Sequence, residues 1–424
     1  MKKINDFISA NTQCYSGTVH PDFANVAHLF SRLQAPRIDH GGASLVVYYN
    51  NEKVVDIYTG KASIESDWNN DTMAMCYSTG KGILATLAHI IVSEGFLTYE
   101  QPIADYWPAF AQNGKEKITL ADVLAHRTGL FDIRGITENA QIMNDWEQML
   151  VRIELAKPRF KPTTEYAYQA LTFGWLVGGI LEKATGKSLN ALMQQYLVDP
   201  LQLDGAYFGT PQNQLDRIAK PFKLIQRTQS AHTQSGDKIK SSQSKPKKIS
   251  LADRLIQFSG QNPQDFIDAM VPKGMKGYSF FDESSLKSVI PSANGVFSAR
   301  SLAKIYAMMA NYGQWDSHQF IDPLIFKQLS KIQTYQRDRV MPIPMHWRLG
   351  YHRVITLGKR VKHGFGHMGY NGSGAWCDPE RKLSFAYTHN FPISSITGDY
   401  RLWGLSQETL RSTDKLISGK KGWF

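Results

Sequence analysis

The sequence of 424 residues predicts an α/β (α+β) protein in which both ends of the chain build one antiparallel sheet flanked by helices. Two observations favour this class. Paired strand-like runs lie near each end of the chain, and the stretch between them is richer in helical patterns. We therefore expect an α/β domain made of residues 1–75 and 290–424, with a mainly helical domain, residues 76–289, inserted between its halves.

The strand-like runs come in two pairs. GASLVVYY (42–49) and KVVDIYTG (53–60) enclose the polar turn Asn50-Asn51-Glu52, a pattern typical of a β-hairpin. Near the other end, GSGAWCD and KLSFAYTHN enclose the turn Pro379-Glu380-Arg381 and predict a second hairpin.

Helical periodicity is strongest in two segments between these hairpins. GILATLAHIIVSEG places its isoleucines and leucines near one face, and TFGWLVGGILEKATG runs from Thr172 to a C-cap at Gly186. Further helices are expected over 191–197 and 299–311.

The composition is that of an ordinary globular protein, with 42% hydrophobic and 20% charged residues, which excludes a disordered or fibrous chain. The net charge of +11 comes partly from residues 227–250, which are rich in Ser, Gln and Lys and predict a basic, mobile surface insertion. Since no nucleic-acid module accompanies this charge, we expect no nucleic-acid partner.

Cysteine usage and hydropathy predict a cytoplasmic, soluble protein. The three cysteines are odd in number and show no Cys-x-x-Cys spacing, which argues against a disulfide framework or a zinc site. Asn5 and Asp6 interrupt the place where a signal peptide would be apolar, and the longest uncharged run, 167–181, is shorter than the ~20 residues of a membrane span. We expect neither a metal nor a cofactor.

One serine stands out as a candidate nucleophile. In MCYSTGKGILATLAHI, which begins at Met75, Ser78 lies one turn before Lys81. The spacing alone decides nothing, because Ser-x-x-Lys also occurs at Ser235, Ser242, Ser244, Ser284, Ser301, Ser412 and Ser418.

The surroundings of Ser78 distinguish it from the others. It lies at a predicted helix start, where free N–H groups favour developing negative charge, and Lys81 falls on the same helix face. Apolar residues follow Lys81, so burial is expected to lower its pKa and let it accept a proton near neutral pH. The strongest competitor, Ser301 with Lys304, is interpreted as a helix N-cap followed by a solvated lysine.

Five blocks, in order along the chain, resemble the penicillin-recognising serine hydrolases, the group of serine β-lactamases and penicillin-binding proteins. Within that group the chain is most similar to the class C β-lactamase-like carboxylesterases called family VIII. The blocks are WNNDTMAMCYSTGKG, YWPAFAQNGKEKITLADVLAHRTGL, KPTTEYAYQALTFGWLVGGILEKATGKSL, VIPSANGVFSARSLAKIYAMMA and FGHMGYNGSGAWCDPERKLSFAYTHN. The resemblance implies a β-lactamase/transpeptidase-like fold and catalysis through a serine acyl-enzyme.

The resemblance also implies a tyrosine that acts with the lysine, and the matching residue is Tyr168. The family's Pro-Gly-Thr-like turn before it reads Pro162-Thr163-Thr164 here, so its glycine is absent. Lys81 beside the phenol is expected to lower the pKa of Tyr168. Without the resemblance, Tyr168 would be interpreted as a packing aromatic.

The third family element, a Lys-Thr-Gly-like triplet on an edge strand, matches His367-Met368-Gly369. The resemblance implies that Gly369 lets substrate approach and that the N–H groups of Ser78 and Tyr370 form the oxyanion hole. Taken alone, His367 would be interpreted as a hydrogen-bonded loop histidine.

His126 invites a different reading, since Asp132 follows it and a Ser-His-Asp triad needs both residue types. The resemblance assigns this block to a structural turn instead.

Two departures from the β-lactamase pattern favour an ester substrate. Ala170 stands where those enzymes carry an asparagine that binds a substrate amide, and Met368 replaces a hydroxyl that binds the lactam carboxylate. We therefore expect a carboxylesterase for small, short-chain or small aromatic esters. A β-lactamase, a peptidase for D-amino acids and a catalytically silent scaffold stay open as alternatives. The order in which Lys81 and Tyr168 accept the proton, and the oligomeric state, are not predicted.

Overall fold

A seven-stranded antiparallel sheet runs through the middle of the protein, in the order β1-β3-β2-β12-β11-β10-β9. The computed structural model describes residues 14–221, 262–358, 360–391 and 399–419. The strands of the sheet are β1 (Ser16–Val19), β2 (Gly42–Tyr49), β3 (Glu52–Gly60), β9 (His352–Arg353), β10 (Phe365–Met368), β11 (Gly374–Asp378) and β12 (Leu383–His389). The predicted fold class is confirmed, because the two ends of the chain meet where β2 pairs with β12.

Both predicted hairpins are present. Asn50 and Asn51 connect β2 to β3 with φ angles of 51° and 62°, a left-handed conformation that asparagine tolerates better than most residues. Lys382, with a φ of 48°, ends the turn between β11 and β12.

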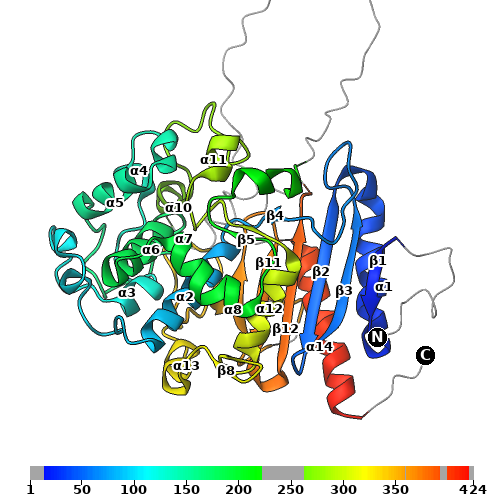
Figure 1. The fold of residues 1–424 in the computed structure, drawn as a ribbon. Coiled ribbons are helices and arrows are strands. Elements are labelled where there is room, and N and C mark those ends of the chain that lie inside the picture. The colour runs from blue at the N-terminus through cyan, green and yellow to red at the C-terminus, as the bar shows by residue number, and fades with distance from the viewer. Residues whose placement is uncertain (1–13, 222–261, 359, 392–398, 420–424) are drawn as a thin grey trace, which may run out of the picture.

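Strand alternation gives the sheet two apolar faces. Leu45 and Val47 of β2 pack with Phe385 of β12 in one core, whereas Val46 and Ala386 belong to the other. The first face is covered by the terminal helices α1 (Ala24–Gln34) and α14 (Tyr400–Ile417). The second is covered by α2 (Thr79–Ser93) and α12 (Ala299–Ala310), beyond which lies the helical part of the chain (Figure 1).

The remaining helices range from three residues in α8 to 14 in α6. The other helices are α3 (Leu120–Leu124), α4 (Ile133–Ile136), α5 (Trp146–Leu155), α6 (Thr172–Thr185), α7 (Leu189–Met193), α8 (Asp199–Leu201), α10 (Pro263–Met270), α11 (Glu283–Lys287) and α13 (Pro323–Leu329). Two small sheets, β4-β6-β5 and β7-β8, contain β4 (Ala74–Met75), β5 (Ala206–Tyr207), β6 (Val296–Phe297), β7 (Gln314–Trp315) and β8 (His318–Gln319).

The helix predictions hold for the long segments and fail for one short segment. α6 ends at Thr185 and is capped by Gly186, whose φ of 69° agrees with the predicted C-cap role. The single helix expected over 191–197 is wrong, because α7 ends at Met193 and a π-helical turn, Gln194–Val198, follows it. The domain boundaries at 75 and 290 stay a prediction.

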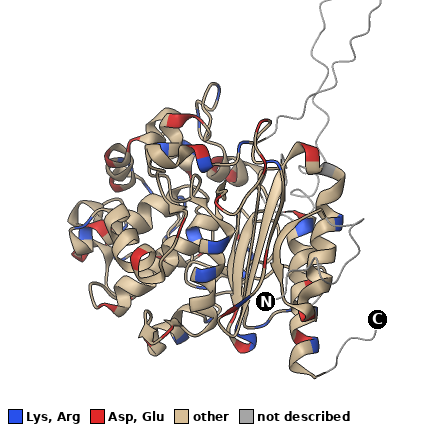
Figure 2. Cartoon of the chain, turned by 45° about the vertical axis from the view of Figure 1, so that its right-hand side comes forward, with Lys and Arg blue, Asp and Glu red and all other residues tan. Residues whose placement is uncertain are grey.

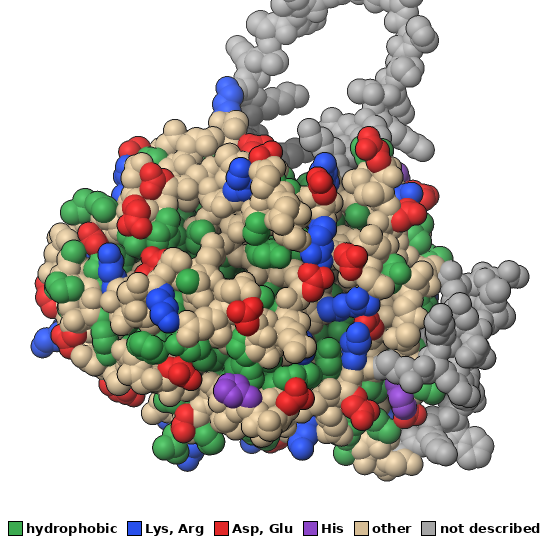
Figure 3. Space-filling view, in the orientation of Figure 1, with side chains coloured by type: hydrophobic (Ala, Val, Ile, Leu, Met, Phe, Trp, Pro, Cys, Tyr) green, Lys and Arg blue, Asp and Glu red, His purple; other side chains and the backbone are tan. Residues whose placement is uncertain are grey.

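Acidic and basic residues are scattered along the described part of the chain (Figure 2), and charged side chains of both signs are interspersed on the face that Figure 3 shows. The basic segment 227–250 lies outside the described residues. Among the described helices, none combines the length and the apolar character needed to cross a bilayer.

Candidate active site

Ser78 lies at the junction between β4 and the start of α2. β4 pairs with β6, and the Cys76 N–H donates to the carbonyl of Gly295 at 2.8 Å, which fixes the backbone just before the serine. Tyr77 follows with a φ of 47°, an uncommon conformation for a residue with a side chain. Ser78 is the half-buried N-cap of α2, and its hydroxyl makes no capping hydrogen bond.

Lys81 is fully buried one turn into α2. Its Nζ donates to Ser78 Oγ at 2.9 Å and to the carbonyl oxygen of Ser292 at 2.9 Å. Burial lowers the pKa of the Lys81 ammonium well below its ordinary value of 10.5. A neutral amine so close to a serine hydroxyl is able to take that hydroxyl's proton.

Tyr168 completes the group of three predicted residues, and the structure brings it against the other two. The Lys81 Nζ lies 5.1 Å from the centre of its ring, and the indole of Trp347 stacks on that ring at 5.4 Å. The carboxylate of Asp338 accepts hydrogen bonds from the Tyr168 N–H at 3.1 Å and from Trp347 Nε1 at 2.9 Å. Asp338 thereby fixes both the backbone of the tyrosine and the indole beneath its ring.

The expected pKa of Tyr168 is wrong in direction. Burial raises the pKa of the phenol, and a hydrogen bond with the Ser78 side chain offsets only part of that rise. The prediction assumed a charged ammonium beside the ring. Burial also disfavours the charged form of Lys81, which weakens the influence that would lower the phenol pKa.

The turn before Tyr168 keeps a left-handed residue although its glycine is absent. Thr163 adopts a φ of 75°, and its N–H donates to the carbonyl of Arg127 at 2.8 Å. A β-branched residue in this region is strained, at a cost of about 1–3 kcal/mol. The hydrogen bond helps to hold the turn in spite of the side chain.

The triplet at the end of β10 divides between the two faces of the sheet. The ring of His367 lies 6.1 Å from that of Tyr168, and its pKa falls well below 6.5 through burial, with smaller contributions from His352 and Lys81. Met368 points the other way and packs in the core under α1 and α14. The expectation that its thioether faces substrate is therefore wrong, because adjacent strand residues alternate sides.

Gly369 is required by a close backbone approach. A Cβ on this residue would lie 2.2 Å from the carbonyl oxygen of Cys76, two residues before the serine. The turn that follows is closed by hydrogen bonds from the Gly369 N–H to Ser373 and from the Gly372 N–H to Gly369, at 2.7 and 3.0 Å. Within the described ranges, no hydrogen bond is donated by the N–H of Ser78 or of Tyr370. Both groups are thus available to a developing oxyanion.

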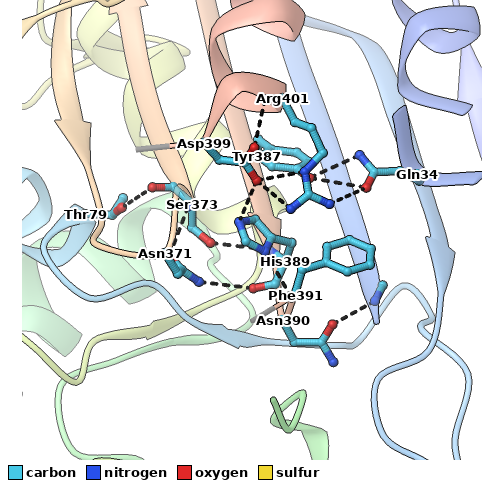
Figure 4. Close-up of polar contacts among 11 residues, drawn as sticks. Gln34, Thr79, Asn371, Ser373, Tyr387, His389, Asn390, Phe391, Asp399 and Arg401 are labelled. Atoms are coloured by element: carbon cyan, nitrogen blue, oxygen red, sulfur yellow. Dashed lines mark hydrogen bonds and ion pairs between the residues drawn. The ribbon is translucent and has the colours of Figure 1, made fainter. Parts of the chain in front are cut away.

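A buried polar network connects this turn to α14 and to α2 (Figure 4). Thr79 Oγ1 donates to the carbonyl of Ser373 at 3.1 Å, and the Ser373 hydroxyl accepts from the His389 N–H at 3.3 Å. The His389 ring approaches Asp399, whose carboxylate accepts from Arg401 Nε at 2.7 Å. The ion pair between Asp399 and Arg401 is almost fully buried and fixes the start of α14 behind the turn.

Two sequence candidates take no part in the hydrogen bonds of Ser78 and Lys81 among the described residues. The His126 ring packs 5.1 Å from that of Tyr168 and 4.3 Å from that of Trp347, and its Nδ1 accepts from the Gln169 N–H at 3.3 Å. Asp132 pairs with Arg159 instead, so no Ser-His-Asp triad forms. Ser301 is not the N-cap that we expected, because Ser298 caps α12. The Ser301 hydroxyl donates instead to Asp204, and Lys304 lies over the Trp315 ring.

Two contributors were missed by sequence reasoning. Ser292 supplies the carbonyl that holds Lys81, from 211 positions away, and Asp338 holds the Tyr168 loop from 170 positions away. Ser292 does lie inside one of the five family blocks, whereas no motif indicates Asp338.

Comparison with known proteins agrees with this geometry. The family model described as Beta-lactamase matches residues 27–402. The esterase/beta-lactamase LipL of Mycobacterium tuberculosis is 33% identical over 389 residues, which cover 90% of this chain and 84% of LipL. A penicillin-binding protein homologue from Caulobacter crescentus has a TM-score of 0.78 at 28% identity, covering 94% of this chain and 100% of that one. The structure of a family VIII carboxylesterase also has a TM-score of 0.78, at 26% identity, and the match covers 94% of this chain and 99% of that one. The predicted resemblance is confirmed, and the chain belongs to the beta-lactamase family of serine hydrolases.

Proposed function

We propose that this protein is a carboxylesterase that cleaves short-chain or small aromatic esters through an acyl-enzyme on Ser78. The observation that carries the proposal is the 2.9 Å hydrogen bond between the buried Lys81 Nζ and Ser78 Oγ. It joins an accessible hydroxyl to an amine whose pKa is lowered by burial, the arrangement that activates a serine.

In the proposed reaction, Ser78 Oγ attacks the ester carbonyl carbon while its proton passes to Lys81 Nζ. The N–H groups of Ser78 and Tyr370 stabilise the oxyanion. The bond to the alcohol oxygen then breaks, and that oxygen takes up a proton. Water attacks the acyl-enzyme in the same way, which releases the acid and restores Ser78. Because the pKa of Tyr168 is raised, we assign it as a neutral donor to the leaving oxygen and Lys81 as the first proton acceptor. The proton on Lys81 then returns to Tyr168, so that both groups are restored before water attacks the acyl-enzyme.

A neutral substrate is favoured by the absence of a free cation beside the serine among the described residues. Lys81 and His367 have pKa values lowered by burial, and Arg401 is paired with Asp399. Ala170, with no amide to offer, stands where a β-lactamase has asparagine. A substrate carboxylate would be desolvated here without a partner, whereas an ester carries no such charge.

A substrate panel tests this proposal. We expect kcat/KM for p-nitrophenyl acetate, butyrate and benzoate to exceed that for nitrocefin and for a D-Ala-D-Ala peptide by at least about 100-fold. The missing cation and the amide missing at Ala170, at ~1–3 kcal/mol each, account for such a difference. Ser78→Ala supplies the background rate, and a fluorophosphonate probe should label Ser78 in the wild type. Preferred turnover of nitrocefin or the peptide would overturn the ester assignment, and absence of the adduct would favour a silent scaffold.

Gly369→Ala tests the oxyanion hole. The added Cβ meets the Cys76 carbonyl at 2.2 Å, so the strand must move and carry the Tyr370 N–H away from the serine. Losing one such donor lowers kcat by about 10²–10³-fold, with a smaller change in KM. The matched control is Gly404→Ala on α14, where a Cβ meets nothing closer than 3.8 Å. A kcat within threefold of wild type in Gly369→Ala would exclude Tyr370 as a donor.

A further inference from the structure

A second recess lies at the β9 edge of the large sheet. It has a volume of about 440 Å³, within the range of small-molecule sites, and segments on either side of β9 line it. Its lining includes His346, Arg348, Arg353, Arg360 and Lys362, together with apolar side chains, and contains no Asp or Glu.

The two innermost arginines keep unused donors. Arg348, only 2% exposed, donates through Nε to the Ser330 carbonyl and through Nη2 to the Lys362 carbonyl, both at 2.9 Å, while its Nη1 has no partner. The Nε of Arg353 is also buried without a partner. Buried donors of this kind are rare unless a ligand or water binds them.

No carboxylate of the described ranges forms an ion pair with the arginines or the lysine of this lining. Asp378, which is close enough to affect the pKa of Arg348, already accepts from Arg381 at 2.5 Å, and Glu380 pairs with His363 at 2.9 Å. The positive charge of the recess is therefore left uncompensated.

The pKa values of three lining groups are lowered mainly by burial, and repulsion between neighbouring charges adds to this at Arg353 and His346. Burial lowers the pKa of Arg348 to about 10 and, with the charge of Arg360, lowers that of Arg353. The pKa of His346 falls through burial and through the charges of Arg353, Arg348 and Arg360. An anion between these groups would relieve the repulsion.

We propose that this recess binds a small polyanion that carries phosphate or carboxylate groups. The unpartnered Nη1 of Arg348 and the guanidinium of Arg353 suit the oxygens of either group, and Arg360 and Lys362 at the rim supply further charge. The apolar walls formed by Val354 and Val361 accommodate a carbon skeleton. The site is distinct from the serine site and does not depend on ester hydrolysis.

Calorimetric titration of the full chain with pyrophosphate and with citrate tests the proposal, with ionic strength held constant by chloride. We expect submillimolar binding of at least one of the two by wild type, weakened at least tenfold in the double variant Arg353→Gln/Arg360→Gln. The matched control is Arg32→Gln/Arg411→Gln. These arginines line a recess of about 400 Å³ that also contains Glu408, so the same charge is removed where an acid is already present.

The titrations distinguish the ligand classes and test whether the recess binds an anion at all. Binding of pyrophosphate alone identifies a phosphate ligand, binding of citrate alone a carboxylate ligand, and binding of both the general polyanion site. Absence of binding, or equal weakening in the control variant, overturns the proposal. If the double variant fails to fold, the exposed Arg360→Gln provides the comparison, with at least threefold weaker binding expected.

Discussion

Replacing Lys81 with methionine is expected to lower kcat for p-nitrophenyl butyrate by about 10³–10⁴-fold, a loss comparable with that in Ser78→Ala. The Lys81 amine is the group within 2.9 Å of the serine hydroxyl that can take its proton, so the nucleophile loses its activation. Because the two groups act as a unit, the double variant should be no slower than either single variant. In wild type, the rate should rise with pH along a limb set by the lowered pKa of Lys81.

Stability provides the control for this substitution. A buried lysine whose folded pKa lies below its unfolded value binds fewer protons in the folded state, which costs folding free energy at neutral pH. Methionine has a similar shape and no charge to desolvate, so Lys81→Met should have a Tm equal to or above that of wild type. A variant that folds well and keeps kcat within tenfold of wild type would show that Lys81 is not the proton acceptor.

The second large effect is expected in acid. Five buried histidines have lowered pKa values, to about 3 for His89 and about 4 for His352, and well below 6.5 for His126, His367 and His389. In the unfolded chain each takes up a proton near pH 6.5. Between that pH and the folded pKa the unfolded state binds more protons, so stability is lost as the pH falls. If the pKa of each of the five histidines were lowered by one unit, the free energy of unfolding would fall by about 7 kcal/mol in acid, which is much of the stability of an ordinary protein.

Urea unfolding at pH 7, 6, 5 and 4.5 measures this loss. His89 illustrates why the loss of stability is large. Its Nδ1 lies 2.7 Å from the Tyr99 hydroxyl and its Nε2 lies 3.0 Å from the Leu349 carbonyl, and a neutral imidazole satisfies both groups. His89→Gln should reduce the pH dependence by about one proton, whereas the exposed His318→Gln should leave it unchanged. A folding free energy that is constant from pH 7 to 5 would contradict the prediction.

Local patterns were sufficient for much of the fold. The hairpin of β2 and β3 follows from strict strand runs around two asparagines, and α6 from its periodicity and Gly186. The π-helical turn after Met193 was not predictable, because hydrophobic spacing over a few residues does not distinguish it from an α-helix.

The candidate site was predictable where its chemistry lies on one helix. Ser78 and Lys81 lie one helical turn apart, so their spacing in the sequence is enough to predict that their side chains are close together. The pKa of Tyr168 and the direction of Met368 depend on burial and strand register, which spacing does not report. The role of Ser292 was not predictable, because Lys81 binds its backbone carbonyl and every residue type has a backbone carbonyl.

The network behind the turn at 369–373 has a consequence for how the protein matures. Thr79 and Ser373 are joined across 294 positions, and Asp399 and Arg401 lie later still. During synthesis Ser78 and Lys81 therefore leave the ribosome long before the groups that anchor the turn opposite them. A nascent chain can hold its reactive pair without the finished site, and turnover reports only those molecules in which α14 has docked.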